Sequence, residues 1–71
     1  MQQIAEGMER VAAVAEKVGV PALAREAGLA ESTVRSYRNR GWTAESLLRC
    51  EMLIAAAERL ERVLDATPPV A

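Results

Sequence analysis

Hydrogen-bond donors are concentrated on one side of the segment 31–40. At about 100° per residue on a helix, four of them share one face: Ser32, Arg35, Ser36 and Asn39. Thr33 and Arg40 flank this face, while Val34 and Tyr37 lie opposite. Guanidinium, amide and hydroxyl groups can bind phosphate oxygens and the edges of nucleic-acid bases. The segment therefore predicts a polar recognition surface on a helix anchored by its apolar side.

Two short helices joined by a sharp turn would hold this surface in place. Pro21 is favoured at the start of a helix, where its missing N–H is not needed, and Gly28 tolerates the positive φ of a tight turn. We therefore expect one helix over about residues 21–27 and a second from residue 30 or 31 to Gly41, another cap. Ala24 is small enough for the two helices to touch.

Longer helices are predicted on both sides of this unit. An apolar stripe at spacings of three and four predicts a helix over residues 2–18; its members are Ile4, Met8, Val11, Ala15 and Val18. Gly19 follows where a left-handed C-terminal cap is expected. Thr43 is a suitable N-cap for a last helix.

The last helix carries its own apolar stripe, made of Leu53, Ala57, Leu60 and Leu64. Leu47 and Leu48 point away from that stripe. Either the helix is kinked or broken near residues 49–51, or its two ends bury against different partners. The tail, residues 67–71, contains two prolines, cannot continue the helix and is expected to be mobile.

The spacing of Ala24, Gly28 and Val34 resembles that of the phage repressor and Cro-like helix-turn-helix family. Apolar residues also stand at that family's usual positions: Leu23, Ala27, Leu29 and Tyr37. The resemblance implies an all-α domain of four or five helices that contains a helix-turn-helix. It also implies a small transcriptional regulator of the prophage type.

The resemblance further implies which residues contact double-stranded DNA. The family's base-reading positions fall on Glu31, Ser32, Arg35, Ser36 and Asn39. Arg can bind guanine bidentately and Asn can bind adenine in the same way. Arg38 and Arg40 are expected to contact phosphates at the end of the helix, with Thr33 flanking the face, and Arg25 could also reach the backbone.

The charge distribution is compatible with this interpretation. The net charge is only −1, but residues 20–50 contain five arginines and three glutamates, a local net of +2. Because phosphate binding depends on local charge, the total charge does not exclude a nucleic-acid partner.

Several other classes of protein are disfavoured. The chain has no histidine and one cysteine, Cys50, so we expect no enzyme activity, no metal site and no cofactor. No apolar run is long enough for a membrane span, and the charged first segment does not resemble a signal peptide. We expect one cytoplasmic domain over residues 1–66, with no membrane or small-molecule partner.

The apolar stripe of the last helix has an intramolecular and an intermolecular interpretation. A chain of this size covers its apolar surface poorly, so we favour a homodimer whose interface is Leu53, Ala57, Leu60 and Leu64. Two-fold symmetry would suit a pseudo-palindromic operator. The expected function is then a sequence-specific regulator, most simply a repressor.

Less specific interpretations stay open. Arg35, Arg38 and Arg40 could form a solvated helix face paired with Glu31 and nearby acids. The chain could instead be a helical protein-interaction module, such as an antitoxin or a phage-encoded inhibitor. Trp42 is expected as a wedge between the last two helices. Cys50 is expected as a small buried residue, and the Tyr37 hydroxyl is expected to reach water or phosphate.

Overall fold

The computed structural model describes residues 2–66, without the side chains of residues 2 and 3. This part of the chain forms four helices and no strand: α1 (Gln2–Val18), α2 (Val20–Ala27), α3 (Glu31–Asn39) and α4 (Leu47–Ala66). The predicted all-α class is confirmed. The predicted bounds of the first three helices agree with the structure to within two residues, whereas α4 begins later than expected. The tail at 67–71, predicted to be mobile, lies outside the described residues.

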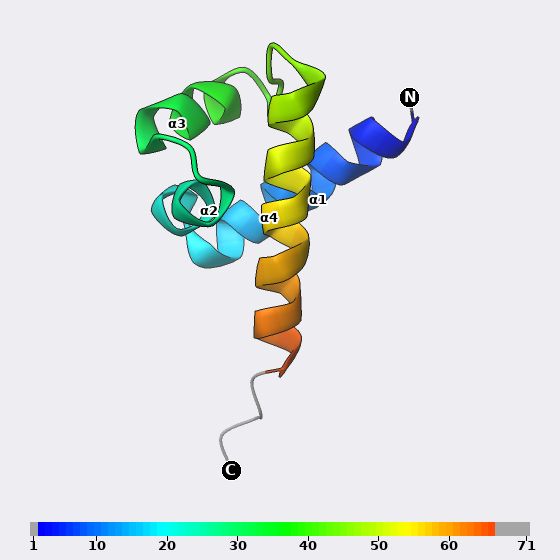
Figure 1. Cartoon of the computed structure of the whole chain (residues 1–71), viewed down its shortest axis with the longest axis vertical. Coiled ribbons are helices and arrows are strands. Elements are labelled where there is room, and N and C mark those ends of the chain that lie inside the picture. The colour runs from blue at the N-terminus through cyan, green and yellow to red at the C-terminus, as the bar shows by residue number, and fades with distance from the viewer. Residues whose placement is uncertain (1, 67–71) are drawn as a thin grey trace.

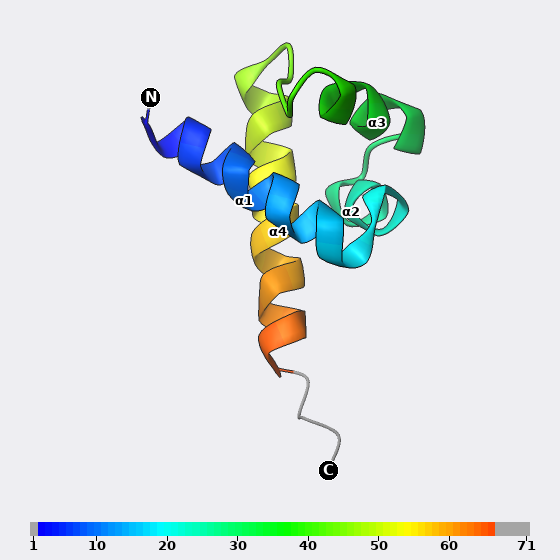
Figure 2. The same ribbon diagram turned by 180° about the vertical axis from the view of Figure 1, so that it is seen from behind.

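The two long helices cross, and α2 packs against both (Figure 1). In the view from behind, α1 passes directly over the middle of α4 (Figure 2). The core between the helices contains Val11, Val14, Leu23, Val34 and Leu53, none more than 1% exposed. α3 packs against α2 at the side of this body. The predicted stripe of α1 therefore faces the other helices, as an amphipathic helix requires.

Gly7 permits the close approach of α1 and α4. A Cβ atom at this position would lie 2.8 Å from Ile54 Cγ1 and closer still to Ile54 Cδ1. Real Cβ atoms do not approach neighbours that closely. Any side chain at this position would therefore require the Ile54 side chain to move, which is consistent with Gly in a helix interior where it is otherwise unfavourable.

A single glycine joins α1 to α2. The expectation of a left-handed cap at Gly19 is wrong, because its backbone lies at φ 88° and ψ 154°, a region used almost only by glycine. The Gly19 N–H donates to the Ala15 carbonyl at 2.8 Å, and its carbonyl accepts from the Leu23 N–H at 3.2 Å. Gly19 thus ends one helix and begins the next, which turns the chain sharply.

The turn between α2 and α3 has the predicted geometry. Gly28 is left-handed at φ 75° and ψ 28°. Its N–H donates to the Arg25 carbonyl, and the N–H of Leu29 donates to the Ala24 carbonyl at 3.0 Å. These two bonds form a Schellman cap, which satisfies carbonyls that the helix end leaves free.

The same arrangement closes α3. Gly41 has φ 73°, its N–H donates to the Arg38 carbonyl at 3.0 Å, and the Trp42 N–H donates to the Tyr37 carbonyl at 2.8 Å. Trp42 itself has φ 60°, an uncommon conformation for a bulky residue. Two successive positive φ values redirect the chain from α3 toward α4.

The first turn of α4 differs from the prediction. Thr43 does not cap the helix, because α4 begins only at Leu47. Instead, the Ser46 hydroxyl accepts a hydrogen bond from the Arg49 N–H at 3.2 Å, which is the bond of an N-cap. α4 continues unbroken to Ala66. Leu47 and Leu48 bury against no partner in the described chain and are 59% and 65% exposed.

The predicted dimer interface on α4 requires a correction. Leu53 and Ala57 are completely buried in the core of their own chain, so they cannot contact a second copy. Leu60 is half-buried against the same core. Leu64, near the C-terminal end of α4, is 41% exposed. The C-terminal turns of α4 extend beyond the other helices (Figures 1 and 2). The stripe therefore holds the monomer together over most of its length.

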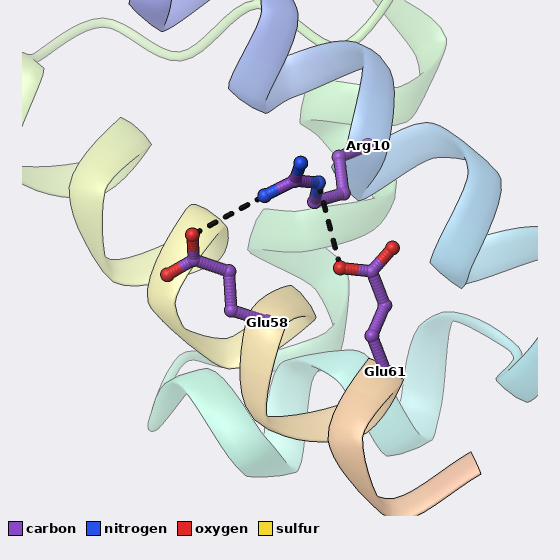
Figure 3. Close-up of polar contacts among 3 residues, drawn as sticks. All are labelled: Arg10, Glu58 and Glu61. Carbon is purple, nitrogen blue, oxygen red and sulfur yellow. Dashed lines mark hydrogen bonds and ion pairs between the residues drawn. The ribbon is translucent and has the colours of Figure 1, made fainter. Parts of the chain in front are cut away.

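Ion pairs connect the helices around this core. The Arg10 guanidinium of α1 lies between two carboxylates of α4, 3.3 Å from Glu58 and 3.4 Å from Glu61 (Figure 3). Arg59 binds α2 through the Glu26 carboxylate and the Glu26 carbonyl, each at 2.8 Å. Because these groups are largely exposed, we expect about 0.2–1 kcal/mol from each pair.

Candidate nucleic-acid interface on α3

α3 is anchored by one face and exposed on the other. Val34 is fully buried and Tyr37 is 2% exposed, as predicted. The residues expected to contact DNA all retain access to solvent. Those classed as exposed are Glu31, Ser32, Arg35, Arg38, Asn39 and Arg40, and those half-buried are Thr33 and Ser36. The helix therefore presents hydroxyl, amide and guanidinium groups from a backbone anchored by its buried face.

Arg35 differs from the other arginines of this segment because it has a carboxylate partner. Its Nη2 lies 2.6 Å from Oε1 of Glu31, one turn earlier on α3. Within residues 4–66, no ion pair involves Arg38 or Arg40. The pairing of exposed arginines with nearby acids, left open by the sequence, therefore occurs at Arg35.

Tyr37 connects α3 to the loop that follows it. Its hydroxyl donates to the Glu45 carboxylate at 2.8 Å, whereas the sequence suggested water or phosphate as its partner. Burial of the ring, followed by this hydrogen bond, raises the pKa of Tyr37 above 10.0. A bond from its own backbone N–H, followed by the bond from Tyr37, lowers the pKa of Glu45 below 4.5. The pair therefore contains a protonated phenol and an ionised carboxylate over a wide pH range.

A shallow depression lies between α3 and this loop. It is lined by Ser32, Thr33, Ser36, Tyr37, Arg40 and Glu45. Glu45 was not among the predicted site residues, because it lies beyond α3, where helical periodicity gives no information about position. The depression adds one acceptor to a surface that otherwise consists mainly of donors.

A larger cavity opens on the other side of the same loop. It has a volume of about 800 Å³ and separates the first turns of α1 from the loop. Its apolar lining includes Ile4, Met8, Trp42, Ala44, Leu47 and Cys50. Trp42 packs against the core while lining this cavity, and Cys50 is buried as a free thiol, as expected. The polar lining of the cavity includes Glu9, Thr43, Glu45 and Ser46.

The described residues contain no cluster of three or more side chains suited to holding a metal ion. Nor does any helix within 2–66 combine the length and the apolar character that a membrane span needs. Comparison with known proteins gave no matching family model, no matching curated sequence and no matching solved structure. The geometry of α3 is therefore the main guide to function.

Proposed function

We propose that the chain is a sequence-specific DNA-binding regulator in which α2 and α3 act as a helix-turn-helix. The observation that carries this proposal is the division of α3 into a buried face, Val34 and Tyr37, and a donor-rich exposed face. A recognition helix needs both, because its base contacts are useful only if the helix is held in a fixed orientation.

The exposed residues suit a division of roles in the major groove, which is wide enough to admit a helix. Arg35 can bind guanine O6 and N7, and Asn39 can bind adenine N6 and N7. Arg38 and Arg40, at the end of the helix, can bind phosphates. Phosphate contacts would then supply affinity and register, while base contacts supply sequence preference.

We further propose that two copies bind a pseudo-palindromic operator. With Leu53 and Ala57 in the core, the large apolar side chains exposed near the C-terminal end of α4 are Val63 and Leu64, at 63% and 41%, and Leu60 beside them is half-buried. A two-fold pair would present two copies of α3 to two half-sites. Occupation of a promoter by such a dimer would repress transcription.

Selection of binding sites from random duplex DNA with the purified chain tests this function. We expect enrichment of a short motif repeated as an inverted pair, and affinity that falls steeply with salt. Arg38→Ala should weaken binding to all duplexes, and Arg35→Ala should relax one position of the motif. Recovery of no motif, with binding insensitive to salt, would refute the proposal.

A second candidate function is a protein-interaction module. It is favoured by the apolar cavity beside Trp42 and by Leu47 and Leu48, which are largely exposed near it. Exposed apolar surface of this kind often marks a protein contact. In that case Leu47→Glu should abolish binding of the protein partner and leave binding to duplex DNA unchanged.

A further inference from the structure

Glu31 and Arg35 form an ion pair on the exposed face of α3. The distance between Arg35 Nη2 and Glu31 Oε1 is 2.6 Å, and the two side chains are 49% and 47% exposed. The glutamate precedes the arginine by one turn, which is the favourable order for such a pair. Among the arginines at 35, 38 and 40, Arg35 is thus the one whose guanidinium is held by a carboxylate in residues 4–66.

We infer that Glu31 is a positioning residue that restricts Arg35 to recognition of guanine. This inference rests on the proposed function. A guanidinium has five N–H donors in a fixed plane, and the bond to Glu31 involves Nη2 alone. The remaining donors suffice for guanine O6 and N7. Because the side chain is oriented before DNA arrives, fewer rotamers are lost on binding.

The charge of Glu31 has a second effect. An unpaired arginine binds the phosphates of any sequence, whereas the carboxylate beside Arg35 offsets its charge and repels phosphate. Glu31 therefore weakens non-specific binding while it favours one base. These opposite effects distinguish a positioning role from simple stabilisation of α3, which would affect all duplexes alike.

The test compares the wild-type chain with Glu31→Gln, which removes the charge and keeps the size. Binding is measured on the selected operator, on the same operator with its guanine contact replaced, and on an unrelated duplex. For Glu31→Gln we expect unrelated DNA to bind about 2- to 10-fold more tightly, with a salt slope steeper by about one. The affinity for the selected operator, divided by the affinity for the operator without the guanine, should fall at least about fivefold.

Glu51→Gln is the matched control, because Glu51 is exposed on α4 and its substitution changes the net charge equally. Glu51→Gln should change neither the affinity for unrelated DNA nor the affinity ratio of the two operator duplexes. If Glu31→Gln leaves the ratio unchanged, or weakens all three duplexes equally, the inference is overturned. Circular dichroism of each variant checks that the total helix content is unchanged.

Arg35→Ala separates failure of the inference from failure of the proposed function. If the wild-type chain selects no sequence, the proposed function itself is wrong, and the inference falls with it. If Arg35→Ala loses the preference at one base pair and Glu31→Gln retains it fully, then Arg35 reads that base without Glu31. In that result the inference alone fails.

Discussion

The Tyr37 hydroxyl donates to the Glu45 carboxylate at 2.8 Å, so the buried anchor of α3 is bonded to the loop that leads into α4. The ring of Tyr37 belongs to the core, whereas Glu45 is exposed. Tyr37 therefore connects the packing of α3 to the loop that follows it. Movement of this loop would be transmitted directly to the proposed recognition helix.

Tyr37→Phe should destabilise the chain modestly, because the ring stays in the core and one hydrogen bond is lost. We expect the melting temperature to fall by about 2–6 °C, measured by circular dichroism. Tyr37→Ala, which also removes the buried ring, should be much more harmful. Equal melting temperatures for Tyr37→Phe and the wild type would mean that the bond contributes nothing to stability.

The same pair predicts a dependence of stability on acid pH. The folded chain lowers the pKa of Glu45 below 4.5, so the ionised form is favoured by folding. This contribution is present above pH 4.5 and is lost as the pH falls through the lower, folded pKa. Denaturant unfolding of the wild type between pH 6 and pH 3 should therefore show a loss of stability, to which other carboxylates also contribute.

Tyr37→Phe supplies the control for that measurement. Since the bond from the hydroxyl is one cause of the low pKa of Glu45, its removal should make the fall in stability less steep. If the free energy of unfolding falls equally steeply with acid pH in the wild type and in Tyr37→Phe, the titration of Glu45 is not linked to folding through Tyr37.

Gly7→Leu should loosen the crossing of α1 and α4. Leucine is the better helix former by roughly 0.8 kcal/mol, yet its Cβ would collide with Ile54. We expect a net loss of about 1–2 kcal/mol in the free energy of unfolding, measured with urea. In the double variant Gly7→Leu/Ile54→Ala, the loss in the free energy of unfolding should be smaller than the sum of the losses in the two single variants. A Gly7→Leu variant more stable than the wild type would show that the helices can separate at little cost.

Leu64→Glu should shift the proposed dimer toward monomer without unfolding it, because Leu64 is 41% exposed near the C-terminal end of α4. Sedimentation equilibrium over a range of concentrations measures the change, and circular dichroism monitors the helices. Leu48→Glu, at the other end of α4, is the comparison. Dissociation by Leu48→Glu alone would place the dimer contact near the start of α4.

Local signals made much of the fold predictable. Gly28 and Gly41 mark the ends of α2 and α3 because few other residues adopt their backbone conformations without cost. The alternation of buried Val34 and Tyr37 with exposed Arg35 follows from helical geometry alone. Each of these predictions depends on residues within one or two turns of each other.

What local patterns did not predict was decided by the path of the loop before α4 and by contacts between distant segments. Thr43 and Ser46 are both good N-caps, and only the path of the loop decides between them. The stripe at Leu53 and Ala57 required burial, but periodicity does not say whether the same chain or a second copy provides it. The approach of Ile54 to Gly7 likewise depends on how two helices cross, which no local pattern records.

Trp42 is the single tryptophan of the chain, and its half-buried position between the α3 cap and the apolar cavity makes it an intrinsic fluorophore at an informative place. Trp42 lines the apolar cavity, and its backbone N–H donates to the Tyr37 carbonyl at the end of α3. A ligand in the cavity would change the polarity around the ring, and DNA on α3 would alter the loop that carries it. The emission of the unmodified chain can therefore follow either event without an attached label.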